Sequence, residues 1–319
     1  MYTRDEVSLM VQVARLYYEN NLNQQEIARR MNLTRQKVSR LLIAGRSQGI
    51  VRIAVVDPNS QDPYLREALK RRFSLHEVVL ISSDKLEADQ LRASIGLAAS
   101  EYLKKAMKDD QIVGIGWGRT LFEAVNLLHS NESRRINIVP LIGGIGDISP
   151  FFQVNELARR LAEAFNGVYR HLYAPAFIQD ETVFDSLLKT QEIAQVKELW
   201  ERLDMAIVGI GHVEFQQISS MFFADHIAPR TLAQLEAMGT VGDICARFFD
   251  IDGKQVFPET GVIGINLEQL RAIPEVIAIA GGMEKERALL GALRGGYIKT
   301  LVTDTATARA VLAEDKERR

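Results

Sequence analysis

From about residue 64, the chain alternates short, almost wholly apolar runs with segments of helical spacing, and several of these runs end in glycine. The apolar runs read EVVLI, QIVGIG, INIVPLIGG, MAIVGIG, VIGIN, EVIAIAGG and KTLVTD. A strand that is apolar at nearly every position is buried on both faces, which is typical of a parallel sheet covered by helices. We therefore predict an α/β fold with a largely parallel sheet. Ligands of such open sheets bind at the carboxyl ends of the strands, where these glycines lie.

The amino-terminal part of the chain differs from the rest in pattern and in charge. Residues 1–60 carry nine Lys or Arg against five Asp or Glu, although the whole chain has a net charge of only −2. The remainder is therefore acidic, which indicates two parts with different partners. The segment DPNSQDP interrupts regular structure between them. We place one domain at 1–56, a linker at 57–63 and a second domain at 64–319.

The first domain has the spacing of three short helices. Two helices are marked by apolar residues at Leu9, Val13, Leu16 and Tyr17, and at Ile27, Ala28 and Met31. After a short turn, Thr34 is well placed as the N-cap of a third helix that runs from about Arg35 to Arg46. This order predicts a helix-turn-helix, in which the second helix of the motif enters the major groove of DNA.

The third helix lies in a segment, 29–52, that holds seven Lys or Arg and no acidic residue. Its buried face is marked by Val38, Leu41 and Leu42, and its opposite face by Arg35, Gln36, Ser39 and Arg40. A solvated basic helix is the simpler interpretation of a lone charge run. Here a helix, a short turn, a capped helix and an acid-free basic face coincide, which favours DNA binding.

The side chains of this helix suit two kinds of contact with DNA. Arg donates two hydrogen bonds to guanine and Gln pairs with adenine, so we assign Arg35, Gln36 and Arg40 to base edges. Lys37, Arg29 and Arg46 are assigned to phosphates, and the strand-like run IVRIAVV is expected to form a wing with Arg52 against the DNA backbone. The predicted DNA-binding residues are Thr34, Arg35, Gln36, Lys37, Ser39 and Arg40.

The run LYYENNLNQQEIARRMNLTRQKVSRLL resembles the DNA-binding segment of the SorC family of bacterial sugar-responsive transcriptional regulators. Further motifs similar to that family follow in family order, namely VGIGWGRT, VPLIGGIG, APAFI, AIVGIG, VGDICARFFD and AGGMEKERALLGALRGGYIKTLVTDTATA. The last two are the most specific. The resemblance implies a Rossmann-like sheet of the sugar-isomerase type in the second domain, and a tetrameric assembly.

The segment GIGWGRT has the order strand, glycine-rich turn and helix, with the helix beginning near Thr120. Amides of such a turn and the positive end of the helix can bind phosphate. A nicotinamide cofactor would require an acidic residue about 20 positions further on, where the chain has Pro and Gly instead. We therefore predict a small phosphate or sugar-phosphate ligand, a choice that the family resemblance supports, at Gly116, Trp117, Gly118, Arg119 and Thr120.

Two charged residues complete the predicted effector site. Asp243 could accept sugar hydroxyls or cap a following helix, and Lys285 could meet phosphate or be a plain solvated lysine, with Arg287 and Arg294 as substitutes. The SorC resemblance points to Asp243 and Lys285 as ligand residues. Gly143 and Gly144 are added as glycines that let a ligand approach the backbone.

Other residue types narrow the functional classes. No apolar run approaches the roughly 18 residues of a membrane span, and the start MYTRDEVSLM lacks a signal-peptide pattern, so we expect a cytoplasmic protein. The five histidines have no metal spacing, and the single cysteine, Cys245, is expected to be a small buried hydrophobe. We predict neither a metal nor a cofactor.

Two functions from different classes fit these features. The first is a regulator that binds operator DNA with an affinity controlled by a phosphorylated sugar or a similar metabolite. The alternative is a sugar-phosphate isomerase with Asp243 as base and Lys285 on the phosphate, but such an enzyme has no use for a helix-turn-helix. Because one helix-turn-helix reads few base pairs, we expect a homo-oligomer, at least a dimer.

Overall fold

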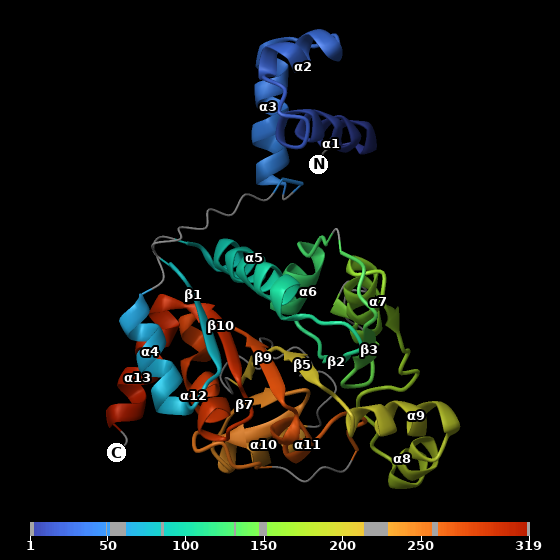
Figure 1. The fold of residues 1–319 in the computed structure, drawn as a ribbon, viewed down its shortest axis with the longest axis vertical. Helices are drawn as coiled ribbons and strands as arrows, with labels where there is room; N and C mark the ends of the chain where they lie inside the picture. Colours follow the sequence, from blue (N-terminus) through green and yellow to red (C-terminus); the bar gives the residue numbers. More distant parts are fainter. Residues whose placement is uncertain are drawn as a thin grey trace. The chain divides into compact units, whose positions relative to one another are not determined.

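The computed structural model describes residues 3–48, 50–51, 62–83, 86–130, 132–146, 152–213, 229–256 and 261–317. The chain divides into two compact units, Met1–Val55 and Val56–Arg319, each with its own elements in Figure 1. The predicted wing falls mostly on residues outside the described part of the chain, Arg52 included. So do residues 57–61 of the predicted linker, whereas Asp62 caps and Pro63 begins the first helix of the second unit.

The first unit consists of α1 (Arg4–Tyr18), α2 (Gln24–Arg30) and α3 (Arg35–Ser47). Each helix begins at a side-chain cap, at Thr3, Asn23 and Thr34, which accepts hydrogen bonds from exposed amides of the first turn. The cap at Thr34, predicted from the sequence, accepts from the Lys37 amide at 3.2 Å. The core of this unit is formed by Met10, Val13, Ile27, Ala28, Val38, Leu41 and Leu42. Buried residues of all three helices thus meet, as expected of a helix-turn-helix module.

The second unit is built on a seven-stranded parallel sheet with the order β1-β10-β9-β5-β2-β3-β4. Its strands are β1 (Glu77–Ile81), β2 (Ile112–Ile115), β3 (Asn137–Pro140), β4 (Val168–Tyr169), β5 (Met205–Val208), β9 (Glu275–Ile279) and β10 (Thr300–Asp304). The predicted α/β fold with a mostly parallel sheet is therefore confirmed.

Helices cover both faces of this sheet, and two separate apolar clusters form its two sides (Figure 1). One face carries α5 (Ala88–Ala106), α6 (Arg119–Asn126) and α7 (Val154–Ala164). The other carries α4 (Pro63–Phe73), α9 (Gln191–Trp200), α12 (Glu286–Arg294) and α13 (Thr305–Glu317). The remaining described helices are α8 (Glu181–Leu188), α10 (Pro229–Ala237), α11 (Leu267–Ala272) and the 3₁₀ turn η4 (Met283–Lys285).

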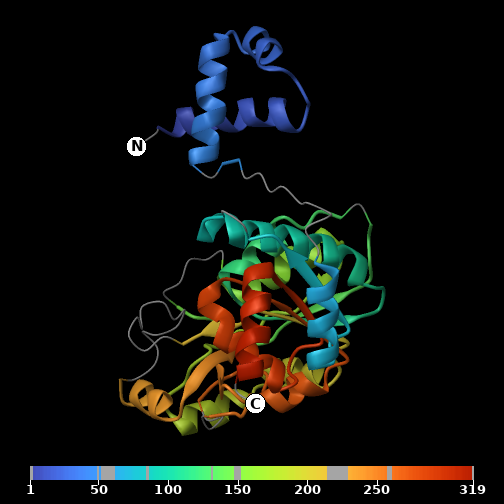
Figure 2. The same ribbon diagram turned by 90° about the vertical axis from the view of Figure 1, so that its left-hand side faces the viewer.

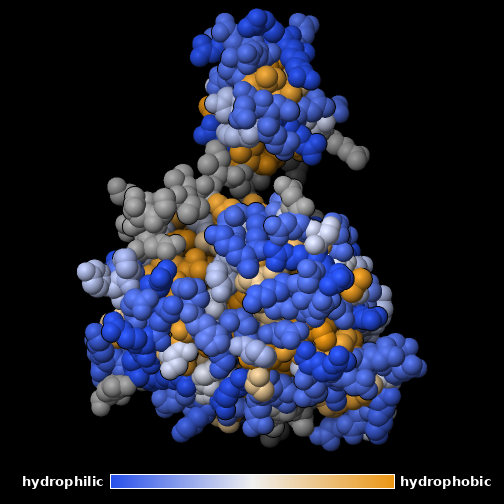
Figure 3. Space-filling model, in the orientation of Figure 1, coloured by the Kyte–Doolittle hydropathy of each residue, from blue (hydrophilic) through white to orange (hydrophobic). Residues whose placement is uncertain are grey.

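The surface is polar over most of its visible face. Figure 3 shows hydrophilic side chains over most of the larger unit, with hydrophobic residues in scattered patches. Within the described part of the chain, no helix is both long and apolar enough to cross a membrane.

A second, antiparallel sheet of three strands was not predicted. It consists of β6 (Gly211–His212), β7 (Thr240–Ile244) and β8 (Arg247–Asp250), in that order. The motif VGDICARFFD forms the β7–β8 hairpin, so Asp243 lies inside a strand of this sheet rather than at the end of a parallel strand.

The prediction of a strand over VIGIN was wrong. Residues 262–266 make only isolated bridges, from Val262 to Phe177 and from Gly264 to Ile142. Arg247 explains the difference, because its guanidinium donates to the carbonyls of this segment at Val262, Gly264 and Ile265. A buried side chain thus satisfies backbone groups that a sheet ladder would otherwise use.

A buried carboxylate joins three helices of the second unit. Asp315 on α13 is 1% exposed and accepts hydrogen bonds from Arg72 on α4 and from Arg294 on α12, the latter at 2.9 Å. Figures 1 and 2 both place α4 beside α13. Burial alone would raise the pKa of Asp315, but the two guanidinium groups bring it below its ordinary value.

We expect Asp315→Asn to lower the free energy of unfolding by about 2–3 kcal/mol at pH 7, because two buried charge-assisted hydrogen bonds lose the ionised acceptor. A depressed folded-state pKa gives stability above the unfolded pKa that is lost as pH falls through the folded value. Urea unfolding should therefore show that the parent's free energy of unfolding falls toward that of the variant below about pH 4. Once Asp315 is protonated in the folded parent, nearly all of the difference seen at pH 7 should be gone. Asp252→Asn is the matched control, because Asp252 also pairs with Arg294 but its side chain is 60% exposed. Equal losses in both variants would contradict the role given to Asp315.

Candidate functional site

The predicted recognition helix is α3, and the face proposed to meet DNA is open to solvent. Arg35, Gln36, Lys37 and Arg40 are exposed and Ser39 is half-buried, whereas Val38 and Leu42 are buried against the other helices. The Thr34 hydroxyl is used as the helix cap, so its first role is to fix where α3 begins. Because α3 contains no acidic residue, its exposed face is positively charged. Contact of these residues with DNA stays a prediction.

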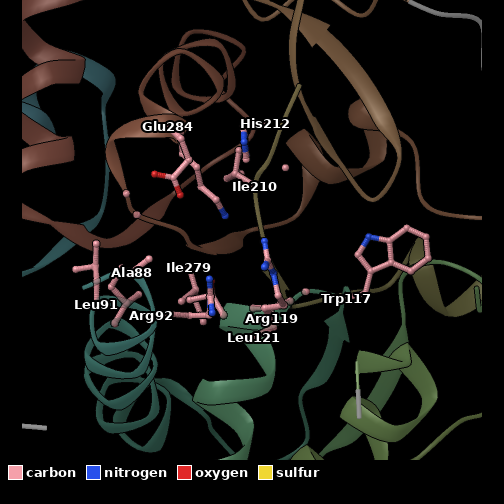
Figure 4. A pocket seen from close by; sticks show the side chains of 18 of the residues that line it. Ala88, Leu91, Arg92, Trp117, Arg119, Leu121, Ile210, His212, Ile279 and Glu284 are labelled. Atoms are coloured by element: carbon pink, nitrogen blue, oxygen red, sulfur yellow. The ribbon is translucent and has the colours of Figure 1, made fainter. Parts of the chain in front are cut away.

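The second unit contains a cavity of about 140 Å³ at the carboxyl ends of β2, β5 and β9 (Figure 4). These three strands are neighbours in the sheet, so the loops that follow them meet at one edge. The cavity is lined by residues from those loops, from the start of α5 and from the β7–β8 hairpin. The lining residues are Ala88, Leu91, Arg92, Ile95, Trp117, Gly118, Arg119, Thr120, Leu121, Gly209, Ile210, Gly211, His212, Asp243, Cys245, Ile279, Gly281, Gly282, Glu284 and Lys285. The cavity therefore lies where an open parallel sheet binds its ligand.

The glycine-rich turn after β2 has the predicted order of strand, turn and helix. Gly118 is the N-cap of α6 with φ of 140°, a conformation that favours glycine, and it supplies no side chain to cap the helix. The first turn of α6 contains Arg119 and Thr120, both in the cavity lining, and no acidic residue. This helix start combines amide donors, a hydroxyl and a guanidinium, which is a suitable chemistry for an anion.

Two residues of this turn, Trp117 and Gly116, pack closely against neighbouring parts of the second unit. The Trp117 side chain is 7% exposed, with its ring centroid 6.4 Å from that of Phe177. Gly116 lies just behind the lining, and a Cβ at this position would come within 3.2 Å of the Cys245 Sγ. Of the five residues predicted at this turn, Gly116 therefore supports the cavity and the other four line it.

Asp243 reaches the cavity from the hairpin. Its side chain is buried, and its Oδ2 accepts from the Ala246 amide at 3.0 Å. The carboxylate can lie there because residue 211 is glycine, since a Cβ would come within 1.9 Å of the Asp243 Oδ1. Burial raises the pKa of Asp243 to about 6, against the Ala246 hydrogen bond and the charge of Lys285. Asp243 therefore caps a hairpin turn rather than a helix, and it is mostly an ionised acceptor at neutral pH.

Lys285 ends η4 and faces the same cavity. Burial lowers the pKa of its ammonium to about 8; Glu284 opposes this shift, and Arg119 and Arg92 add to it. The turn before it is fixed by the Gly282 amide, which donates to Asp304 and Thr307 at 2.9 and 3.0 Å. Asp304 is itself buried and accepts from the Thr307 hydroxyl at 2.6 Å.

The two arginines considered as substitutes for Lys285 lie elsewhere. Arg294 ends α12 in the cluster around Asp315, and Arg287 is exposed and outside the cavity lining. Gly143 and Gly144 also lie outside that lining and form close contacts with the chain at residues 174–175. A Cβ on Gly143 would be 2.6 Å from the Ala174 carbonyl, so backbone packing already requires glycine there. A role of these two glycines in effector binding stays a prediction.

Cys245 is the buried small residue that was expected. It is 4% exposed, and burial together with the nearby Asp243 raises the pKa of its thiol to about 12. It remains a thiol at neutral pH, which makes it a poor nucleophile.

Sequence reasoning missed the wall of the cavity formed by α5. This wall consists of Ala88, Leu91, Arg92 and Ile95, which have the i, i+3, i+4, i+7 spacing of one helical face. A single Arg inside that otherwise apolar stripe was the available signal. His212 and Glu284 were also missed, and Figure 4 shows them across the cavity from Arg92 and Arg119.

A helix-turn-helix unit and a separate α/β unit, with a cavity lined by both charged and apolar side chains, define a transcriptional regulator with a ligand-binding domain. A family model described as "Putative sugar-binding domain" matches residues 57–313. The sorbitol operon regulator of Klebsiella pneumoniae is 33% identical over 318 residues, covering 98% of this chain and all of the relative. The deoxyribonucleoside regulator of Bacillus subtilis (strain 168) is 30% identical over 311 residues, covering 97% and 98%.

The solved structure of the full-length sorbitol operon regulator SorC from Klebsiella pneumoniae superimposes with a TM-score of 0.74 at 33% identity, over 97% of this chain and all of that one. The chain belongs to the SorC family of transcriptional regulators with a sugar-binding domain. These relatives are transcriptional regulators rather than enzymes.

Proposed function

We propose that this protein is a sequence-specific regulator whose affinity for operator DNA is controlled by a phosphorylated sugar or a similar small metabolite. In this proposal α3 binds the operator and the cavity at the ends of β2, β5 and β9 binds the effector. Arg35, Gln36 and Arg40 contact base edges, whereas Lys37 contacts phosphate. The protein acts as a dimer or tetramer, because a single helix-turn-helix reads few base pairs.

The observation that carries this proposal is the meeting of two chemistries in one cavity. The start of α6 with Arg119, together with Lys285, offers donors and positive charge to a phosphate. Asp243 offers a buried carboxylate that can accept from hydroxyl groups. A ligand with a phosphate at one end and hydroxyls further along satisfies both.

The effector acts by binding one DNA-affinity state of the protein better than the other. A ligand shifts such an equilibrium only by its difference in affinity for the two states. A coupling of about 1–3 kcal/mol changes operator affinity by roughly 5- to 150-fold. The same factor must describe the effect of operator DNA on effector binding.

The test is a thermal-shift screen that compares phosphorylated sugars with the same sugars lacking phosphate. A ligand that binds only the folded protein stabilises it by about 2.7 kcal/mol at 100 times its Kd. We expect at least one phosphorylated sugar to raise the melting temperature, and its unphosphorylated parent to have no effect at equal concentration. The proposal fails if no phosphorylated compound stabilises the protein, or if the unphosphorylated parents do so equally.

A further inference from the structure

The α5 wall of the cavity contains a positive charge, Arg92, that is not part of the phosphate site proposed above. Ala88, Leu91 and Ile95 give this wall an apolar surface, and Arg92 is its single charged residue. Figure 4 shows the Arg92 side chain reaching into the same hollow as Arg119, opposite Glu284 and His212. The Arg92 side chain is only 24% exposed, so most of it is withdrawn from solvent.

Three cations therefore converge on the cavity from separate parts of the chain: Arg92 from α5, Arg119 from α6 and Lys285 from η4. Both guanidinium groups lower the pKa of the Lys285 ammonium, so each lies within electrostatic reach of Lys285. Glu284 and Asp243 in the same lining offset part of this positive charge, and a bound anion would offset more of it, because like charges gathered in a partly buried site repel each other.

The local partner of Arg92 does not explain this position. Within the described residues, Arg92 pairs with Asp89 through Nη1 at 2.6 Å, and the Asp89 side chain is 93% exposed. Such exposed i, i+3 pairs contribute little to stability. Because a guanidinium has five N–H donors, a bond to Asp89 through Nη1 still allows Arg92 to donate to a ligand.

We propose that Arg92 is an effector-binding residue, and that with Arg119 and Lys285 it forms a three-cation site for the dianionic form of a phosphate monoester. This inference rests on the proposed function and adds to it the charge state of the effector. Two guanidinium groups on different helices can hold two phosphate oxygens by paired hydrogen bonds, while the Lys285 ammonium acts as a point charge.

The proposal is tested with inorganic phosphate as the probe, at pH 7.5 and constant ionic strength set with chloride. Its Kd is measured by thermal shift for the full chain and for Arg92→Gln. We expect the Kd to rise by about 10-fold or more in Arg92→Gln, because a charge-assisted hydrogen bond to the dianion is lost. Arg92→Lys should recover part of the affinity, since it keeps the charge but lacks the planar fork.

Two matched controls separate this role from a general loss of charge. Arg287→Gln removes an exposed arginine outside the cavity lining, and Asp89→Asn removes the exposed partner of Arg92. Both should bind phosphate within about twofold of the parent, or more tightly for Asp89→Asn. Melting in chloride alone should be no lower in Arg92→Gln than in the parent, which excludes a folding defect.

The outcomes distinguish this inference from the proposal on which it rests. Phosphate binding by Arg92→Gln within twofold of the parent would overturn the role of Arg92 and leave the effector site intact. A loss that Arg287→Gln reproduces would show a non-specific charge effect and would also overturn it. A parent protein that does not bind phosphate at all would overturn the proposed phosphate effector, and the three-cation site with it.

Discussion

Replacing Arg35 and Arg40 by alanine is expected to remove most of the specific operator affinity. Each substitution should cost about 1–3 kcal/mol if the side chain reads a base, and each should relax the preference at one position of the site. The two losses together amount to about 2–6 kcal/mol if they add. The measurement is fluorescence anisotropy with an operator obtained by selection from random DNA, at a fixed and moderate salt concentration.

Two variants calibrate this result. Lys37→Ala should weaken all DNA sequences alike and reduce the salt dependence, because a phosphate contact carries no sequence information. Arg15→Ala should have little effect, since Arg15 lies on α1 with a side chain 69% exposed and pairs with Glu19. A circular dichroism melt is required for each variant, because damage to buried Val38 or Leu41 would also abolish binding. Unchanged operator affinity in the double variant would show that α3 is not the recognition helix.

Substitution of the effector-site charges is expected to separate DNA binding from its control. Asp243→Asn and Lys285→Ala should bind the operator nearly as the parent does, but each should require at least about 10-fold more effector to change that binding. Asparagine is preferred at position 243 because its amide oxygen can still accept from the Ala246 amide, whereas alanine would leave that buried donor unsatisfied.

The measurement is operator binding titrated with the strongest phosphorylated ligand of the thermal-shift screen. Lys105→Ala is the control, because Lys105 is an exposed residue of α5 outside the cavity lining. Response of both variants at the effector concentrations of the parent would place the effector site elsewhere. Loss of operator binding by folded variants would instead show that these residues support assembly of the regulator.

Local sequence signals were sufficient for the parts of the structure that depend on neighbours in the chain. The Thr34 cap, the buried face of α3 and the turn into α6 are all decided within a few residues, and all three were predicted correctly. The continuous apolar runs likewise identified six strands of the parallel sheet, because a strand that is buried on both faces is apolar at nearly every position.

Features that depend on distant contacts could not be read in this way. The run VIGIN is as apolar as a true strand, but its carbonyls at Val262, Gly264 and Ile265 accept from Arg247, which approaches them only in the folded chain. The helical spacing of Ala88, Leu91 and Ile95 marks out Arg92 on an apolar face, but the cavity that this face lines has its other walls many residues further along the sequence, so the spacing alone did not identify a ligand site. The hairpin around Asp243 was missed because Cys245 and Ala246 occupy its turn with positive φ, where Asn or Gly is usual.

The central claim is that one phosphorylated metabolite, bound in the cavity, controls affinity for the operator. The most direct measurement is a pair of titrations on the parent protein: operator affinity with and without saturating effector, and effector affinity with and without saturating operator. We predict that both affinities change by the same factor, within about 5- to 150-fold, and that Lys285→Ala needs at least about 10-fold more effector than the parent for the same change in operator affinity. An effector that binds the protein tightly but leaves operator affinity unaltered would contradict the account.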